Sequence, residues 1–301
     1  MNTTTTSDTL RPTKNTSNPF ASLAIVNGKR SESWKANEQW LDQPLRWKKP
    51  RKIFVCAHGD LFHESVPDEW IDKVFAVMAL APQHTFQVLT KRPERARKYL
   101  QNPIGGTMRR DWIMAAIGKQ TDSQRFKAFD WPLPNVWLGT SISDQASADL
   151  RIPELLACPA AVRFLSVEPM LGAVDLTRIT ECDYAELENA KPGDIISGWE
   201  IDALRGDASD QINGSLTGEY RKTYGTAKIN WVICGGESGP KARAMHADWA
   251  RSLRDQCFAA GVPFFFKQWG ENGLNGHRVG KRAAGRLLDG REWNEMPEAT
   301  A

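Results

Sequence analysis

In the stretch Trp231-Val232-Ile233-Cys234-Gly235-Gly236-Glu237-Ser238-Gly239-Pro240, an apolar run ends abruptly in two glycines, a carboxylate and a hydroxyl. An unbroken apolar run is typical of a parallel strand that is buried on both faces. The two glycines let the backbone approach a ligand closely at the point where Glu237 and Ser238 emerge. The stretch therefore predicts a buried strand that leads into a ligand site.

Five further segments repeat this pattern of an apolar run followed by polar residues. They are residues 53–56 before His58-Gly59-Asp60, 86–89 before Thr90-Lys91-Arg92, 136–139 before Thr140-Ser141, 162–167 before Glu168-Pro169, and 262–266 before Lys267-Gln268-Trp269. We expect six strands whose polar ends share one rim.

Segments with helical periodicity lie between the predicted strands. Residues 68–80 follow Pro67, begin with an acidic turn and carry an apolar stripe, and further helices are predicted at 93–100, 144–156 and 246–260. Repeated strand–helix–strand units imply parallel strands with right-handed crossovers, hence an α/β barrel or a doubly wound sheet. In both architectures the ligand site lies at the carboxyl ends of the strands.

The composition is compatible with one α/β domain. The chain has 301 residues, of which 41% are hydrophobic, and this is enough for a single large core. Its net charge of +3 is too small to imply nucleic-acid binding by itself. The five cysteines are odd in number and lack metal-ligand spacing, which favours reduced core thiols in a cytoplasmic protein. No signal peptide is expected, and no apolar run approaches the roughly 18 residues of a membrane helix.

The predicted domain spans residues 31–291, after a Thr-, Ser- and Asn-rich opening (1–30) that we expect to be disordered, and before a tail (292–301). Two insertions interrupt the strand–helix pattern. The first, near 105–130, has apolar residues of its own and is expected to form a helical insertion. The second, near 177–228, is polar and turn-rich, and it either folds over the rim or is flexible.

Several sequence blocks together resemble one family of proteins. The blocks are Asp60-Leu61-Phe62-His63-Glu64, Leu89-Thr90-Lys91-Arg92-Pro93-Glu94-Arg95, Ser166-Val167-Glu168-Pro169-Met170-Leu171-Gly172, Cys234-Gly235-Gly236-Glu237-Ser238-Gly239-Pro240 and residues 281–291. In this order, from about Trp40 to Arg291, they closely resemble the bacteriophage and prophage three-cysteine-motif proteins, which have a radical-S-adenosylmethionine-like core. The resemblance implies a partial or complete (β/α) TIM-like barrel of the radical-SAM type that binds an iron–sulfur cluster and S-adenosylmethionine.

The chain departs from this family at the amino terminus. The family carries three closely spaced cysteines after its first barrel strand, and their thiolates hold three irons of a four-iron cluster. Here no cysteine precedes Cys56, and the others, Cys158, Cys182, Cys234 and Cys257, are scattered. We therefore expect a shortened member that has lost its first strand–helix unit and its cluster, and that retains an adenosyl-ligand pocket.

The predicted rim contains the candidate ligand-binding residues. They are Asp60, His63, Thr90, Lys91, Arg92, Thr140, Ser141, Glu168, Gly235, Gly236, Glu237, Ser238, Arg243, Lys267 and Gln268. By the resemblance, Glu237 and Ser238 contact S-adenosylmethionine, and the plainer alternative is an acidic cap on the following turn.

Plainer roles also exist for two other groups of the rim. Glu168 either faces a ligand or forms an ion pair with Lys267 or Arg243. The Thr90-Lys91-Arg92 sequence either holds an anion, with Arg92 as a bidentate fork, or forms a helix-starting turn before Pro93.

A metal site is a further hypothesis. His58, Asp60 and His63 could hold a divalent ion together with Glu168 or Glu237, and this would suit a metal-dependent hydrolase. The plainer roles are a His63 that hydrogen-bonds its own loop and an Asp60 that caps the helix starting near Pro67.

Three classes of function thus stay open. The chain is an enzyme, or the descendant of one, with an adenosyl-ligand site; a non-catalytic binding or scaffold protein; or a metal-dependent hydrolase. Its substrate, a small molecule or a macromolecule, is not identified by the sequence. The basic stretch Arg46-Trp47-Lys48-Lys49-Pro50-Arg51-Lys52 could contact a nucleic-acid backbone, or it flanks a strand as a solvated segment.

Overall fold

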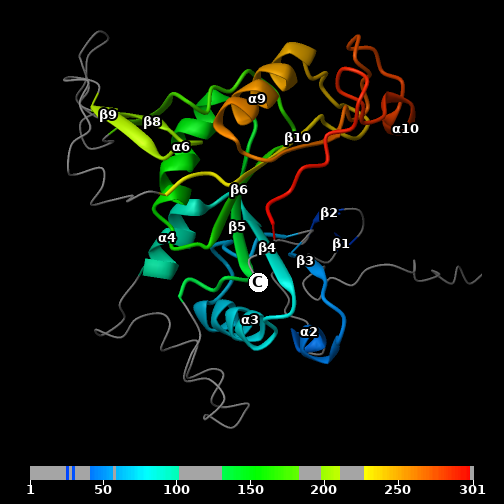
Figure 1. The fold of residues 1–301 in the computed structure, drawn as a ribbon. Coiled ribbons are helices and arrows are strands. Elements are labelled where there is room, and N and C mark those ends of the chain that lie inside the picture. Colours follow the sequence, from blue (N-terminus) through cyan, green and yellow to red (C-terminus); the bar gives the residue numbers. More distant parts are fainter. Residues whose placement is uncertain are drawn as a thin grey trace, which may run out of the picture.

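The computed structural model describes residues 25–26, 29–30, 41–56, 59–101, 131–182, 198–210 and 227–298. Its centre is a parallel six-stranded sheet in the order β11-β10-β6-β5-β4-β3, curled into a half-barrel (Figure 1). The strands are β3 (Lys52–Val55), β4 (Thr85–Thr90), β5 (Val136–Ile142), β6 (Val162–Val167), β10 (Trp231–Gly235) and β11 (Phe264–Gln268).

The six predicted strands are confirmed, and so is the partial form of the predicted barrel. Strands that are neighbours in this sheet are also consecutive along the chain among its six strands, so the strand order shows none of the reversal of a doubly wound sheet. The described strands do not close a ring, because β3 and β11 form two separate edges.

Four long helices connect the strands and cover one face of the sheet (Figure 1). They are α3 (Asp68–Leu80), α4 (Pro93–Gln101), α6 (Gln145–Leu156) and α9 (Ala247–Ala260), as predicted to within a residue or two. Local chemistry explains their ends. Asp144 and Ser147 form a capping box that starts α6, and Gly261, with φ of 65°, ends α9 in the left-handed conformation. Two short helices, α2 (Gln43–Arg46) and α10 (Lys281–Ala284), lie outside this pattern.

The two faces of the sheet carry different apolar clusters. Side chains such as Val88, Leu138 and Val232 point toward the helices and join the main core. On the inner face, the buried side chains Trp137, Val162, Phe164 and Trp231 form a second cluster, with Leu89, Ile233, Phe265 and Met296 packed against it and partly exposed. The half-barrel is therefore filled by aromatic rings at the amino-terminal end of its concave side.

Part of the second insertion is regular structure. Strands β7 (Ile179–Cys182), β8 (Gly198–Asp202) and β9 (Asp207–Asp210) form an antiparallel sheet beside α6 (Figure 1). Ile179 and Ile201 are fully buried, and the Thr180 amide donates to Asp149 of α6. The insertion was expected either to fold over the rim or to be flexible, and its described strands pack on α6. The first predicted insertion, near 105–130, lies outside the described residues.

Two terminal segments pair with the rest of the chain or with themselves. In the opening that was expected to be disordered, β1 (Ile25–Val26) and β2 (Lys29–Arg30) pair antiparallel, and the remainder of 1–30 lies outside the described residues. In the predicted tail, residues 293–296 run antiparallel along β11. Phe266 donates its amide to the Trp293 carbonyl, and Glu295 donates its amide to the Phe264 carbonyl. The β11 edge is therefore covered by the chain itself.

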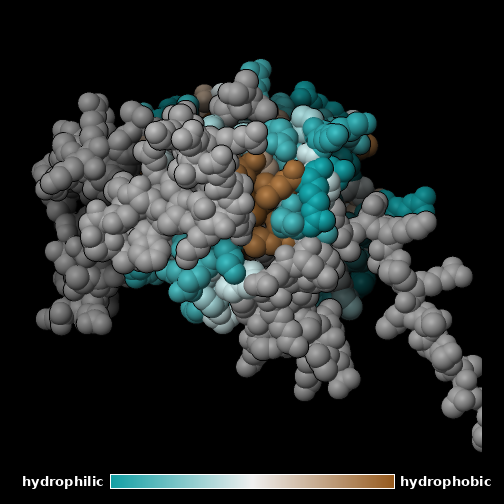
Figure 2. Space-filling model, turned by 90° about the horizontal axis from the view of Figure 1, so that it is seen from below, coloured by the Kyte–Doolittle hydropathy of each residue, from teal (hydrophilic) through white to brown (hydrophobic). Residues whose placement is uncertain are grey.

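Some apolar side chains remain at the surface, among them Phe54 on β3 and Phe258 on α9. Seen from below, the molecule shows an apolar strip with hydrophilic residues along one side (Figure 2). Over the described ranges, no helix combines the length and the apolar character that crossing a bilayer requires.

Candidate functional site

The strand register brings the predicted rim residues to one end of the sheet. Thr90 of β4 pairs with Thr140 of β5, and Gly235 of β10 pairs with Gln268 of β11. Thr140 also donates its hydroxyl to the Thr90 carbonyl at 2.9 Å. Because all six strands are parallel, their carboxyl ends form a common mouth. The expectation of one polar rim is therefore met by the geometry of the described strands.

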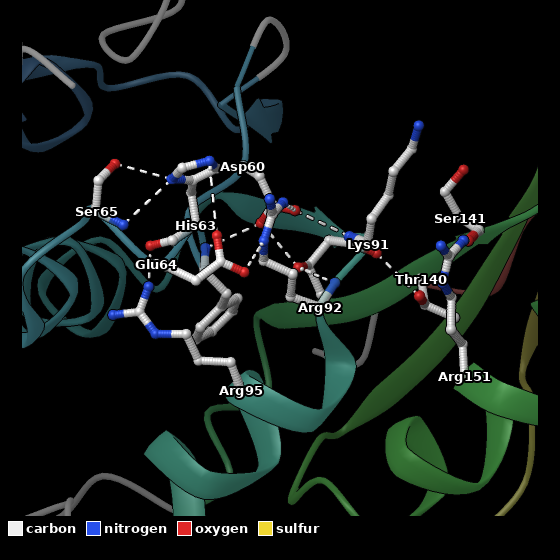
Figure 3. Close-up of polar contacts among 12 residues, drawn as sticks. Asp60, His63, Glu64, Ser65, Lys91, Arg92, Arg95, Thr140, Ser141 and Arg151 are labelled. Carbon is white, nitrogen blue, oxygen red and sulfur yellow. Dashed lines mark hydrogen bonds and ion pairs between the residues drawn. The ribbon is translucent and has the colours of Figure 1, made fainter. Parts of the chain in front are cut away.

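Asp60 fastens the loop after β3 to the end of β4 (Figure 3). Its Oδ1 accepts from the Thr90 hydroxyl at 2.7 Å and from the Phe62 amide at 3.0 Å, and its Oδ2 accepts from the Lys91 amide and from Arg92 Nη1 at 3.0 and 3.1 Å. Such a carboxylate has most of its lone pairs occupied. Asp60 therefore acts here as a structural acceptor.

Arg92 is held by two carboxylates. Besides Asp60, it contacts Glu64 through its Nε at 2.5 Å, and this hydrogen bond holds the pKa of Glu64 below its usual range. Lys91, in contrast, is exposed, and its side chain points away from the cluster in Figure 3. Helix α4 begins directly afterwards at Pro93. The Thr90-Lys91-Arg92 sequence is thus both a charged rim segment and the turn that starts α4.

The residues proposed for a metal site are engaged in other contacts. His63 Nδ1 lies 2.8 Å from the Ser65 hydroxyl, so His63 hydrogen-bonds its own loop as the plainer interpretation predicted. Asp60 does not cap α3, because the N-cap position is Pro67 and no side chain caps it, so that expectation was wrong. His58 lies outside the described residues, and within those that are described no three His, Cys, Asp or Glu side chains gather as metal ligands would.

Glu168 is the centre of a second polar cluster at the mouth. Lys267 Nζ donates to its Oε2 at 2.7 Å, and Gln268 Nε2 donates to its Oε1 at 3.3 Å. The same Gln268 amide also contacts the Ser238 hydroxyl at 3.3 Å. Of the two ion-pair partners considered for Glu168, the structure has Lys267. The pair is largely open to solvent on the lysine side, with half of that side chain exposed.

Glu237 has a different partner, Arg243. Its Oε2 accepts from the Arg243 amide at 2.8 Å and from Nε at 2.9 Å, and its Oε1 accepts from Nη2 at 2.9 Å. These hydrogen bonds to the charged form lower the pKa of Glu237 to about 2. Glu237 therefore stabilises the turn after β10, close to the acidic-cap role that was the plainer alternative.

The diglycine after β10 has a packing reason. A Cβ on Gly236 would lie 1.9 Å from the Trp269 carbonyl oxygen, and one on Gly235 would lie 2.9 Å from Glu168 Oε1. In the loop after β11, a Cβ on Gly270 would lie 2.1 Å from the Glu237 carbonyl oxygen. The backbones of the two loops touch, so glycine at 236 is required by this contact whether or not a ligand binds.

One rim residue was missed by the sequence reasoning. Arg151 stands two turns into α6, and its Nη1 donates to the Ser141 carbonyl at 2.6 Å (Figure 3). Helical side chains lean toward the helix amino terminus, and α6 begins at the rim. That rule could have identified Arg151 from its position alone.

The cysteines are core side chains. Cys56, Cys158, Cys234 and Cys257 are buried and unpaired, and burial raises the pKa of all four thiols, to about 12 for Cys158 and Cys257. The side chain of Cys182 lies outside the described part of the structure. A buried thiol of raised pKa is a poor source of the thiolate that iron requires.

The basic stretch lies at the other end of the sheet. Arg46 pairs with Asp42, and the Arg51 guanidinium lies 4.3 Å above the Trp47 ring. The ring face that could stack on a base is thus covered on one side by the chain's own arginine. The stretch leads into β3 at its amino-terminal end, remote from the mouth.

The chain matches the family model described as "Protein of unknown function (DUF5131)" over residues 4–297. No curated protein and no solved structure matches the chain significantly.

Proposed function

The chain belongs to the DUF5131 family of proteins of unknown function, and we propose its function from the residues at the mouth of the half-barrel. The chain binds an adenosyl ligand of the S-adenosylmethionine kind there, and it does so without an iron–sulfur cluster. On this proposal it is a cluster-free relative of radical-S-adenosylmethionine proteins of phage type, with a substrate that the site does not identify.

The Glu168 cluster carries the proposal. This carboxylate stands at the carboxyl end of a central strand, and Lys267 and Gln268 fix its two oxygens from the same side. Carboxylate oxygens accept hydrogen bonds, so Glu168 suits the hydroxyls of a ribose. Gly235 leaves the space above Glu168 without a side chain.

The inner face supplies a second requirement, an apolar surface for a purine. Leu89, Ile233 and Phe265 are partly exposed over the aromatic cluster of Trp137, Phe164 and Trp231. Small-molecule sites commonly combine such an apolar lining with a few polar groups that fix orientation. An adenine ring on this lining would leave its ribose near the strand ends.

The cysteines support the cluster-free part of the proposal. The four thiols whose burial is described lie on different elements or their ends, and burial keeps them protonated. After anaerobic incubation with iron and sulfide, we expect the protein to remain without visible sulfur-to-iron absorption. A coloured protein with stoichiometric iron would contradict this part.

Calorimetry tests the ligand itself. We expect S-adenosylhomocysteine to bind, and Glu168→Gln to weaken it about tenfold, because a hydrogen bond to a charged group is worth roughly 1.5–3 kcal/mol. Glu94→Gln is the matched control, since Glu94 pairs with Lys98 on the surface of α4. Absence of any binding to the unmodified protein would overturn the proposal and favour a scaffold role.

A further inference from the structure

Arg151 occupies a distinctive place at the mouth. It comes from α6, behind the strands, and reaches the carboxyl end of β5, where Figure 3 shows its guanidinium beside Thr140 and Ser141. Its one hydrogen bond within the described structure goes to the Ser141 carbonyl, and the side chain is half-buried. Since a guanidinium has five N–H donors, most of its donors remain available.

Three other rim cations differ from Arg151. Arg92, Arg243 and Lys267 each pair with a carboxylate within 4 Å. Arg151 has no such partner among the residues that the structure describes. Asp144, Asp60 and Arg92 act on it only at longer range, and partial burial lowers its pKa, although an arginine stays charged at neutral pH. A half-buried positive charge of this kind is stabilised by an anion.

Ser141 links this group to the Glu168 cluster. Its carbonyl accepts from Arg151, and its hydroxyl donates to the Glu168 carbonyl oxygen at 3.4 Å. Arg151 and Glu168 are therefore linked through Ser141 at the neighbouring ends of β5 and β6. Lys91 adds a second positive charge at the end of β4.

We propose that the Arg151 guanidinium forms a subsite for an oxyanion of the ligand. The two N–H groups of its fork would hold either a carboxylate or a phosphate. Arginine presents two parallel N–H groups that match the spacing of such oxyanions. The inference rests on the proposed function: in an adenosyl ligand with an amino-acid tail, the oxyanion is the tail carboxylate, and in a nucleotide it is the 5′-phosphate.

Three probes separate these cases by calorimetry. S-adenosylhomocysteine has the carboxylate, adenosine 5′-monophosphate has the phosphate, and methylthioadenosine has neither. We expect the unmodified protein to bind one of the two anionic probes at least tenfold more tightly than methylthioadenosine. Which anionic probe is preferred identifies the oxyanion.

Arg151→Gln should abolish this preference by lowering the affinity for the anionic probe to that for methylthioadenosine, whose own affinity stays unchanged. Arg151→Lys keeps the charge without the fork and should restore only part of the preference. Arg46→Gln, on α2 at the other end of the sheet, is the matched control and should change nothing. If Arg151→Gln only destabilised the fold, the affinities for all three probes would fall together.

The outcomes distinguish the two proposals. If all three probes bind the unmodified protein and Arg151→Gln leaves their ratios unchanged, the subsite is overturned and the adenosyl site stands. If none of the probes binds, the adenosyl site is overturned and the subsite with it.

Discussion

At the scale of single residues, Gly236 is fixed by its neighbour's backbone. A methyl group there would meet the Trp269 carbonyl oxygen at 1.9 Å, and neither loop can move without separating β10 from β11. We expect Gly236→Ala to lower the free energy of unfolding by about 1–3 kcal/mol or more, the usual cost of overpacking. Gly59→Ala is the control, because nothing lies within 4 Å of a Cβ there, and it should stay within about 0.5 kcal/mol. Equal stability of both variants in urea denaturation would contradict the contact.

Glu237 gives a prediction about pH. Since its pKa is lowered to about 2 in the folded chain and is roughly 4.3 in an unfolded one, its ion pair contributes stability above pH about 4.3. That contribution is lost as the pH falls toward 2. We expect a carboxyl NMR titration of Glu237 to give a midpoint near 2, and Arg243→Gln to raise it toward 4.3, because only the amide bond from residue 243 remains. A midpoint near 4.3 in the unmodified protein would refute the pairing.

The sequence identified which residues follow the strands, because an unbroken apolar run that gives way to polar residues marks a strand end. It could not identify their partners. Glu168 had two candidate cations, and the choice of Lys267 over Arg243 depends on how the loop after β10 turns. Asp60 was considered as a cap of α3, yet it accepts hydrogen bonds from the end of β4. Local sequence does not predict this contact, because the two segments are neighbours only in space.

At the scale of elements, α6 orients part of the mouth. Asp144 accepts from the Ser147 amide at 2.8 Å, and Ser147 Oγ accepts in return from the Asp144 amide at 3.1 Å. Asp144→Ala should therefore cost about 1 kcal/mol of unfolding free energy, as the loss of an N-cap usually does. The control is Asp255→Ala, because Asp255 is exposed within α9 and pairs with its neighbour Arg254. Thermal denaturation of the two variants side by side checks this, and an equal effect would refute a capping role.

The elements of the half-barrel were predictable, and those of the second insertion were not. Helix α3 spans residues 68–80 as predicted, because Pro67, an acidic first turn and an apolar stripe agree with one another. Strands β8 and β9 are short and carry aspartates, and they are stabilised by packing of Ile201 and Ala208 rather than by their own propensity. Such tertiary effects are invisible to a reading of local pattern.

At the scale of the whole molecule, the last described residues complete the sheet. Removing residues 292–301 would free the Phe264 and Phe266 amides of β11 and the carbonyl of Phe264, worth roughly 3 kcal/mol at about 1 kcal/mol per hydrogen bond. An uncovered edge strand also pairs with other chains. We expect the shortened chain to be less stable and to self-associate in light scattering, whereas removal of 299–301 alone should leave both properties unchanged. A monodisperse, equally stable product of the longer deletion would contradict this role.

The same segment determines how solutes reach the concave face. Met296 packs on the aromatic cluster at the amino-terminal end of the strands, and Lys52 of β3 contacts its sulfur at 3.3 Å, so the segment bridges from β11 toward the opposite edge. Within the described residues, this segment and the aromatic cluster thus cover the amino-terminal end of the concave face. A ligand of the proposed site would therefore have to enter and leave at the carboxyl ends of the strands, so that two such ligands would bind one after the other.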